Sequence, residues 1–553
     1  MRSRSWALVG VSAVLVLTSC AGQRATPSSS QPVLGGLSRD AASWTYATSL
    51  AVVAPGDLPR VDLPACARRH LPSGWVGREN AHTGDPSWRP TTLWGTTRVP
   101  IYLDRQSTVC GSPVRVHLGG QGEAGVTVRA YRIGWYAGAG ARLVWTSPPV
   151  TVRTDPGARR RGVEMPSPGW AAAVALPVDA AWTPGEYLVE SWDAGGLAGV
   201  APLVVRDEAD SGGLLVVHSN LTWAAYSQYL GSSLYKGSDG ATDTRALSVS
   251  IQRPVTGSGF AALLTGDVPL TQFVEQQGLT ARHILDTDLD AWPSMAQAAN
   301  AVVLPGHSEY WTRRMYDAAL AARNAGVNLA DLGANELYWH ARLDRAADGT
   351  PLTLTVDRTL AQDPTATATP QNATVRWAQA PLNRDGAALI GQRYSALKAQ
   401  GGLQVWSLPR WLAVGTHLRP GQVLSHLVVN EADGIRPGEH AAPPDLQTVL
   451  LGVLRHRGSP DVAASTTYYT SGSGAAVFSA GTTYWTCDLT GACPAASAPP
   501  AVAQVVRAMT ADVLRGFATA GFGRRHPSSA QGPTSLAQAL RVLRPSAVGT
   551  YGA

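Results

Sequence analysis

The sequence predicts an all-β domain of immunoglobulin-like type followed by an α/β domain with a mostly parallel sheet. Residues 91–207 hold short alternating apolar runs, among them 114–118, separated by Pro-Gly and Gly-Gly pairs, as is typical of β-sandwiches. From residue 213 onward, apolar runs of strand length alternate with helical patterns, as expected for parallel strands joined by crossover helices. The chain of 553 residues is also too long for a single core.

Composition places the chain among folded globular proteins. Apolar residues make up 44% and charged residues 15% of the sequence, which is typical of a protein with a sizeable core. The 45 Lys and Arg residues exceed the 39 Asp and Glu residues only slightly, and the excess is spread along the chain. Because nucleic-acid binding needs a concentrated basic surface, we expect no nucleic-acid partner.

The N-terminal residues 1–19 are predicted to be a lipoprotein signal peptide. Arg2 and Arg4 precede a mostly apolar run at 6–17, which is too short to span a bilayer. The sequence LTSC ending at Cys20 looks like a bacterial lipobox, in which the cysteine becomes the lipidated first residue of the mature protein. Several acyl chains on Cys20 would anchor the protein stably at the extracytoplasmic face of the cell membrane. The alternative is an ordinary cleaved signal with an incidental cysteine.

Shifts in composition divide the rest of the chain. Residues 21–38 are rich in Ser, Pro and Gly and lack an apolar pattern, so they are predicted to be part of a tether. We expect a tether with an N-terminal extension at 20–90 and the β-sandwich at 91–207. The α/β domain is expected at 213–524, with a Thr- and Pro-rich insertion at about 345–400, and a C-terminal tail at 525–553.

Four cysteines remain after Cys20, an even number that suggests disulfides in an exported protein. Cys487 and Cys493 are the natural short pair, which leaves Cys66 with Cys110. A zinc site of four thiolates would need paired ligand spacings that the first two cysteines lack. We therefore predict disulfides, although sequence alone does not fix their connectivity.

Chemistry-bearing residues gather in the stretch 301–344. The apolar run 301–304 predicts a buried strand, and a helix capped by Thr312 and closed by Gly326 follows it. A second strand is predicted at 327–332. Each strand leads into a loop with a Tyr-Trp pair and an acid. Such loops lie at the edge of an open α/β sheet where ligands bind.

Further strands are expected on either side of this stretch. They are predicted at 214–217, 283–285, 404–406, 424–429 and 474–478. The first leads into an aromatic loop that begins at His218, and the fourth ends in the sequence NEADG at 430–434. Apolar side chains at helical spacing predict a final long helix over 502–517. In the tail, only 536–543 has the pattern of a short helix.

Several familiar catalytic motifs are absent from the sequence. No cysteine lies between Cys110 and Cys487, so a cysteine nucleophile within the sheet region is excluded. No Gly-x-Ser-x-Gly elbow is present, and Ser308 lacks the flanking glycine of such a turn. The sequence also has no phosphate-binding Gly-x-x-x-x-Gly-Lys loop and no zinc-binding His-Glu-x-x-His helix.

What remains at the expected strand ends is a set of oxygen donors with two histidines. Its members are Tyr310, Tyr338, Glu309, Glu336, Glu431, Asp433, His218 and His307. Phenolates and carboxylates are hard donors that suit ferric iron. Such an ion could polarise a carbonyl and lower the pKa of bound water, as amide hydrolysis requires. The alternative is that the tyrosines are packing residues with satisfied hydroxyls.

The motifs GHSEYW at 306–311, GANELYW at 333–339 and EAD at 431–433 resemble the C-terminal domain of the large (beta) subunit of N,N-dimethylformamidase and its relatives. Supporting matches are RIGWY, SNLTW, AALIG and AVFSAG, at 132–136, 219–223, 387–391 and 476–481. The motifs share the family's order and cover most of the chain. The resemblance implies an immunoglobulin-like β domain followed by an amidotransferase-like α/β domain.

The resemblance also implies a mononuclear iron held by two tyrosines and one glutamate, acting on a small amide. Carried over motif by motif, the metal ligands are Tyr310, Tyr338 and Glu431. The catalytic or substrate-facing residues are then His307, Glu309 and Asn335.

We therefore expect a surface-anchored, iron-dependent hydrolase of an amide-type C–N bond. Its expected partners are a small amide or an envelope-derived ligand, and the membrane through the lipid anchor. Leu221, Ser308, Asn430 and Ala432 depart from the family pattern, which affects the expected substrate more than the metal ligands. The signal peptide is a further departure, so dimethylformamide is not the expected natural substrate.

Two other functions stay open at this point. The 18 Trp and 16 Tyr against 5 Phe suit a non-catalytic lipoprotein that binds envelope glycan or peptide by stacking. A glycoside hydrolase with an acid pair such as Glu309 and Glu336 is the other, although no spacing fixes the carboxyl separation. The sequence is compatible with a homo-oligomer and does not specify one.

Overall fold

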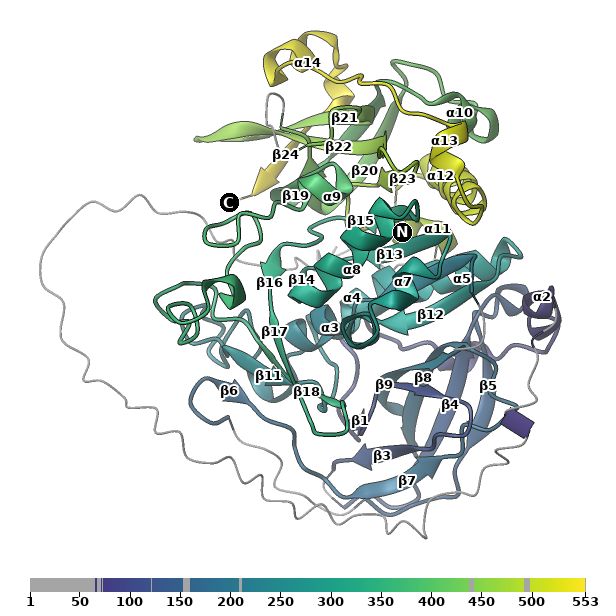
Figure 1. Ribbon diagram of the computed structural model, residues 1–553. Helices are drawn as coiled ribbons and strands as arrows, with labels where there is room; N and C mark the ends of the chain where they lie inside the picture. Colours follow the sequence, from purple (N-terminus) through teal and green to yellow (C-terminus); the bar gives the residue numbers. More distant parts are fainter. Residues whose placement is uncertain are drawn as a thin grey trace, which may run out of the picture.

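The computed structural model describes residues 65–66, 71, 73–120, 122–152, 160–207, 211–436, 442–491 and 498–552. Figure 1 shows a β-rich lower part, in purple and blue, against which the helices and strands of the later chain pack. Strands dominate, and the sheets are mixed and accompanied by helices, which confirms the predicted combination of all-β and α/β parts. The finer immunoglobulin-like and amidotransferase-like assignments stay predictions. The predicted signal peptide with Cys20 lies outside the described residues.

The β-rich part holds two sheets that share one core. Their strands are β1 (Ile101–Leu103), β3 (Val114–Leu118) and β7 (Ala172–Leu176) in one sheet, and β2 (Ser107–Val109), β9 (Gly196–Arg206), β8 (Gly185–Asp193), β4 (Thr127–Ile133) and β5 (Ala141–Thr146) in the other. Neighbours are antiparallel except β2 and β9. Alternate residues, such as Val114 with Val116 and Val128 with Ala130, enter the shared core. The apolar residues that alternate along the sequence therefore form the buried face of each strand.

The later chain is built on a ten-stranded sheet. Its strands are, in spatial order, β12 (Ala281–Leu285), β10 (Leu214–His218), β13 (Ala301–Gly306), β15 (Asn328–Gly333), β23 (Ala476–Ser479), β22 (Ser459–Thr470), β21 (Gln447–His456), β24 (Val548–Gly552), β19 (Arg393–Val405) and β20 (Val423–Gly434). The first five are mutually parallel, whereas the others are antiparallel except for β21 with β24. The prediction of a mostly parallel sheet is wrong for this second half, because short turns between β21, β22 and β23 can join only antiparallel strands.

The C-terminal tail contributes a strand to this sheet. The predicted short helix is confirmed as α14 (Leu536–Val542). Beyond it, β24 pairs with both β21 and β19 and so lies inside the sheet. A Cβ added at Gly549 would lie 2.1 Å from the Gln400 carbonyl oxygen, so only glycine allows this approach. The sequence pattern does not predict this strand.

Helices accompany both the β-rich part and the ten-stranded sheet (Figure 1). They are α2 (Trp75–Glu79), α3 (Asn220–Tyr226), α4 (Ser258–Ala262), the π-helical turn η5 (Leu263–Asp267), α5 (Val268–Gln276), α6 (Asp286–Ala291), α7 (Ser294–Gln297), α8 (Arg313–Asn324), α9 (Ala387–Ile390), α10 (Arg410–Thr416), α11 (Cys487–Thr490), α12 (Pro500–Phe517) and α13 (Phe522–Arg525). The predicted cap of α8 is confirmed, since the Thr312 side chain accepts a hydrogen bond from the Met315 amide. The predicted final long helix is confirmed as α12.

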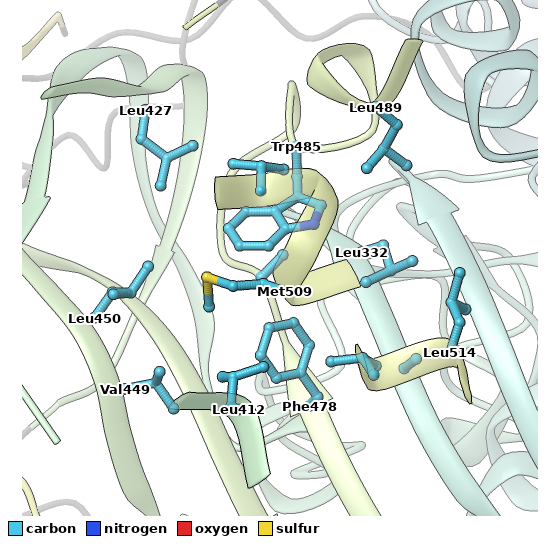
Figure 2. Packing of buried hydrophobic residues seen from close by; sticks show 14 of the residues in the cluster. Leu332, Leu412, Leu427, Val449, Leu450, Phe478, Trp485, Leu489, Met509 and Leu514 are labelled. Atoms are coloured by element: carbon cyan, nitrogen blue, oxygen red, sulfur yellow. The ribbon is translucent and has the colours of Figure 1, made fainter. Parts of the chain in front are cut away.

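Strand β13 shows how the two faces are separated. Ala301 and Val303 belong to the core that α12 covers, whereas Val302 and Leu304 pack in the core of α8. Figure 2 shows the first of these cores, where Leu332, Phe478 and Met509 surround Trp485. The indole Nε1 of Trp485 donates to Thr510 on α12, 2.9 Å away, so its polar edge is satisfied. Both faces of β13 are thus fixed by packing, which gives the loop after it a rigid support.

Two small sheets lie beside the main one. They are β17 (Arg342–Arg345), β18 (Pro351–Thr355), β11 (Ser248–Ser250) and β6 (Glu164–Met165) in one, and β14 (Tyr310–Trp311) with β16 (Trp339–His340) in the other. The predicted disulfide between Cys66 and Cys110 is confirmed. Cys487 is disulfide-bonded, and its predicted partner Cys493 lies outside the described residues. Among the helices of the described chain, none has the length and apolar character needed to cross a membrane.

Candidate active site

The first loop of the candidate site begins where β13 ends at Gly306. This residue has φ +49°, and a Cβ added to it would lie 2.5 Å from the Gly266 Cα, so both conformation and contact require glycine. The loop leads to Tyr310 on β14, which pairs in parallel with β16. The amide of Trp339 donates to the Glu309 carbonyl at 2.9 Å. The two predicted Tyr-Trp loops are therefore joined by main-chain hydrogen bonds.

The second loop follows β15 and is held by β20. Asn335 has φ +60°, a left-handed conformation that asparagine tolerates better than most residues. Its amide N–H donates to Asp433 Oδ1 at 2.7 Å, and its side-chain Nδ2 donates to Glu431 Oε2 at 3.0 Å. Asn335 therefore fixes the position of Glu431 relative to the strand ends.

Glu431 reaches this edge by a route that local sequence does not show. It was predicted just after a strand, but it lies inside β20, beside Asn430 with φ +68°. The segment after β23 bridges β15 and β20: the Ala480 amide donates to Asp331 O at 2.8 Å, and the Asp433 amide donates to Gly481 O at 3.0 Å. The strand that carries Glu431 is thereby tied to the carboxyl end of β15.

His307, Tyr226 and Glu309 form a hydrogen-bonded chain. His307 Nδ1 lies 2.8 Å from the Ala334 carbonyl oxygen, which can only accept, so Nδ1 carries a proton. Its Nε2 lies 2.9 Å from the Tyr226 hydroxyl, which donates to Glu309 Oε2 at 2.6 Å. The same Nε2 lies 3.7 Å from Glu309 Oε2 and 3.8 Å from Glu431 Oε2. One imidazole nitrogen therefore faces both carboxylates.

Tyrosines form one wall around these carboxylates. Tyr235 also donates to Glu309, and its ring stacks on Tyr226 with 4.4 Å between centroids. Tyr310 is fully buried beside both rings, and Arg358 donates to its hydroxyl at 3.3 Å. Burial raises the pKa of Tyr310 well above its usual value, and the Glu309 carboxylate raises it further, whereas Arg358 opposes the shift. As the chain stands, these phenols are neutral at physiological pH.

Tyr338 contacts the cluster from its flank. It is half-buried, and its hydroxyl accepts from Arg376 at 3.4 Å. Its ring packs edge-on against Tyr394, with 5.2 Å between centroids. Burial raises the pKa of Tyr394 well above its usual value, and Glu431 and Tyr338 raise it further, so Tyr394 is close to both. The structure thus brings His307, Glu309, Asn335 and Glu431 into direct contact, with Tyr310 adjacent and Tyr338 connected through Tyr394.

Burial raises the pKa values of four carboxyls in and beside the site. Burial raises the pKa of Glu431 to about 7, and the neighbouring Glu309 adds to the shift while His307 opposes it. Burial also raises the pKa of Asp433 to about 7, against its hydrogen bond from the Asn335 amide. Burial also raises the pKa values of Asp331 and Glu336 well above their usual range, with repulsion from Asp433 adding to the shift of Asp331 and repulsion from Asp331 adding to that of Glu336. Fully ionised carboxyls at this density would repel one another, so the site favours protons or a cation.

A cavity of about 50 Å³ opens beside His307, whose side chain is 13% exposed. Its walls include Tyr226, Gly306, Asn430 and Tyr484. The imidazole whose Nε2 faces the two carboxylates therefore forms part of the wall of a small cavity.

The donor set limits which residues could hold a metal. In the part of the chain that the structure describes, no three histidine, cysteine, aspartate or glutamate side chains are arranged to hold an ion. A metal here would need the phenols of Tyr310 and Tyr338 together with Glu431. Two phenols and a carboxylate are hard oxygen donors, and they fit a ferric ion.

Several neighbours of the site were not predicted as site residues. Tyr226 ends α3 and Tyr235 lies in the segment that follows it, both after β10, so the rule that ligands bind at the carboxyl edge could have included them. Arg358 comes from the predicted insertion, and Tyr394 comes from the antiparallel β19. No local pattern marks either of these two residues, because only long-range pairing brings them to the edge.

Together these features define an α/β protein with a candidate acid–base centre at the carboxyl edge of its sheet. The model of the family described as N,N-dimethylformamidase beta subunit-like, C-terminal, matches residues 127–497, and the chain belongs to this family. The resemblance seen in the sequence is thereby confirmed, and the family suggests an amide hydrolase. No curated protein matches the chain.

Proposed function

We propose that this protein is an iron-dependent hydrolase of an amide-type C–N bond in a small substrate. One observation carries the proposal: His307, Glu309, Asn335 and Glu431 form a single connected cluster beside a cavity, within the segment that the family model matches. The cavity is small, and Ala261, Ala262 and Gly306 are among the residues that line it, which suits a small uncharged amide.

Tyr310, Tyr338 and Glu431 would hold the iron, which when bound supplies a Lewis acid that polarises the amide carbonyl and lowers the pKa of a water molecule. Asn335 orients Glu431 through its 3.0 Å hydrogen bond. Arg358 lies with its guanidinium carbon 4.4 Å from the Tyr235 ring centroid, and its positive charge favours ionisation of Tyr310.

His307 is placed to move a proton to the leaving nitrogen. A proton at Nε2 is donated to the Tyr226 oxygen, while Tyr226 keeps its own hydrogen bond to Glu309. The Glu309 carboxylate stabilises this charged arrangement at 3.7 Å from Nε2. Because Nε2 belongs to a side chain that lines the cavity, it can release the proton to an amine that forms there.

Metal analysis of the purified protein, together with visible absorption, tests this proposal. We expect one iron per chain and a phenolate-to-iron absorption band that Tyr310→Phe and Tyr338→Phe each remove or shift. Tyr551→Phe is the matched control. Tyr551 lies on β24 in the tail, and its hydroxyl donates to the Pro460 carbonyl of β22 rather than to the site. A protein without iron after reconstitution, or a band that survives both site variants, would contradict the proposal. A non-catalytic ligand-binding protein would then be favoured.

Anchoring through Cys20 is a separate part of the proposal. We expect the wild-type chain to fractionate with membranes in a bacterial host and Cys20→Ser to move to the soluble extracytoplasmic fraction. Equal membrane association of both chains would contradict lipid anchoring and leave the enzymatic proposal untouched.

A further inference from the structure

A second, much larger cleft lies apart from the candidate active site. Its volume is about 890 Å³, within the range of small-molecule sites, and it lies between the β-rich part and the α/β part. Arg105 and Arg206 line it from the first part, and Trp292, Arg313 and Arg314 line it from the second. None of the six predicted metal or catalytic residues is among its lining residues.

The cleft is lined by many charged side chains, and their ion pairs decide which of them can bind a ligand. Six arginines and four aspartates line it. The two buried aspartates are already engaged, because Arg206 pairs with Asp288 at 3.0 Å and Arg345 pairs with Asp290 at 2.7 Å. The other two aspartates lie on the β17–β18 hairpin and are exposed. Arg342 is also engaged, with Asp357 and Asp363 at 2.7 Å each, and Arg105 pairs with Asp104 at 3.8 Å. Among the described residues, the lining arginines without an ion pair to a carboxylate are therefore Arg313 and Arg314.

Arg313 and Arg314 are the first two residues of α8. Arg313 donates to the Gln371 carbonyl, and Arg314 donates to the carbonyls of Asp290 and Ala291 at 2.6 and 3.0 Å. These partners are neutral main-chain groups, so both cationic charges stay uncompensated by them. The first turn of α8 has no acidic residue, and the partial positive charge of the helix N-terminus adds to the same field.

Trp292 gives the cleft a flat apolar surface. Its side chain is 47% exposed, which is unusual for tryptophan, and the Arg206 guanidinium carbon lies 4.6 Å from its ring centroid. An exposed indole beside arginines can stack against a sugar ring or an aliphatic chain while the charges bind an acid.

We propose that this cleft binds a polar molecule of disaccharide or dipeptide size with a net charge of −1 or −2 that is carried by carboxylates. Arg313 and Arg314, whose partners are main-chain carbonyls, match one or two negative charges. A more highly charged polyphosphate would meet repulsion from Asp344 and Asp348, the two exposed aspartates in the lining. The site is independent of the proposed amide hydrolysis, since it shares none of that cluster's residues.

Isothermal titration calorimetry on the full chain tests the proposal with digalacturonate and diglutamate, and with lactose and dialanine as their neutral counterparts. We expect at least one acidic probe to bind at least tenfold more tightly than its neutral counterpart, with weaker binding at higher salt. The acidic probe that binds identifies the source, sugar or peptide. Equal affinity for acidic and neutral probes, or binding of none of them at millimolar concentration, overturns the proposal.

Substitutions of lining residues test whether the acidic probe binds in the cleft. The double variant Arg313→Gln and Arg314→Gln is expected to weaken the acidic probe at least tenfold, because hydrogen bonds from charged donors are lost. Trp292→Ala, at an exposed position, is expected to weaken it as well and decides the matter if the double variant unfolds. Arg419→Gln is the matched control, since Arg419 is exposed and outside the lining. Unchanged affinity in Trp292→Ala and in a folded double variant overturns the assignment.

Discussion

Two histidine clusters lie at the carboxyl ends of neighbouring parallel strands, and they differ in access to space. At the end of β10, His218 Nδ1 lies 3.1 Å from Asp267 Oδ1, and its Nε2 lies 3.0 Å from His283 Nδ1. Its side chain is 0% exposed, whereas that of His307 after β13 is 13% exposed and borders a cavity. Both clusters contain groups with strongly shifted pKa values. The difference teaches that a perturbed buried network marks a reaction centre only where a substrate can reach it.

The buried cluster around His218, which we call the sealed cluster, joins the β-rich part of the molecule to the α/β part. The cluster around His307 is called the open cluster. Glu186 comes from β8 of the β-rich part, and Thr271 on α5 donates to its Oε2 at 2.6 Å. Asp267 accepts from Trp223 Nε1 at 3.1 Å as well as from the amide of Ser219. Every group faces another part of the protein. We therefore expect changes here to alter folding stability and changes at the open cluster to alter catalysis.

The largest effect is expected from His307→Gln in the open cluster. Loss of the proton at Nε2 should lower amide hydrolysis by about 10²–10⁴-fold, the usual contribution of a general acid or base. The measurement is release of amine from a panel of small amides, with the thermal midpoint recorded in parallel. His82→Gln, at an exposed histidine, is the control. Equal loss of activity in His283→Gln without unfolding would remove the distinction between the two clusters.

Asp267→Ala tests whether the sealed cluster serves folding stability rather than catalysis. It leaves His218, Trp223 and the Ser219 amide without a buried acceptor, so the free energy of unfolding should fall by about 3–5 kcal/mol. Urea unfolding measures this change, and Asp445→Ala, at an exposed aspartate, should change it by less than about 0.5 kcal/mol. Activity per folded molecule should stay at the wild-type level. A catalytic defect with unchanged stability would show that the sealed cluster takes part in the reaction.

The pH dependence of stability gives a smaller test of the same cluster. Burial raises the pKa of Glu186 to about 7 from its ordinary 4.5, with Asp267 adding to the shift and His218 opposing it. Between these two pH values the carboxyl is ionised in the unfolded chain and neutral in the folded one, so stability falls as pH rises. The loss from this group should reach about 3 kcal/mol by pH 8.

Glu186→Gln keeps a neutral side chain at every pH and isolates that contribution. Its unfolding free energy should match the wild type near pH 4 and exceed it near pH 8, as measured by urea unfolding at several pH values. A difference between the two chains that does not vary with pH would show that Glu186 is ionised in the folded state.

Sequence predicted the open cluster only as far as local pattern reaches. The apolar runs at β13 and β15, separated by the Thr312-capped helix, are sufficient to place the loops with His307 and Asn335 at one edge. The family resemblance added Glu431. The structural route to Glu431, through a positive φ at Asn430 and the bridge at Gly481, depends on contacts between distant segments that carry no local signal.

The remaining differences have the same physical origin. β24 is a five-residue strand with two glycines, and it forms because β21 and β19 offer free main-chain groups on both sides. Arg358 reaches Tyr310 only because its segment folds back over β16. The metal and catalytic roles of the site residues stay predictions, because position alone does not test a reaction.

The smallest expected effect is at Asn335, the residue that ties the open cluster together. Asn335→Gly keeps the left-handed conformation at φ +60° but removes the hydrogen bond to Glu431 Oε2. Iron affinity and amide hydrolysis should each fall by about 10–100-fold, as is typical when a residue that orients a ligand is lost. Asn383→Gly is a matched control, since Asn383 is exposed and has φ +49°. Both substitutions place glycine at a residue with a left-handed conformation, so both increase backbone flexibility in the same way. Any loss of iron affinity or activity that is confined to Asn335→Gly must therefore come from the missing side chain. Equal effects of the two would mean that Glu431 is positioned by β20 alone.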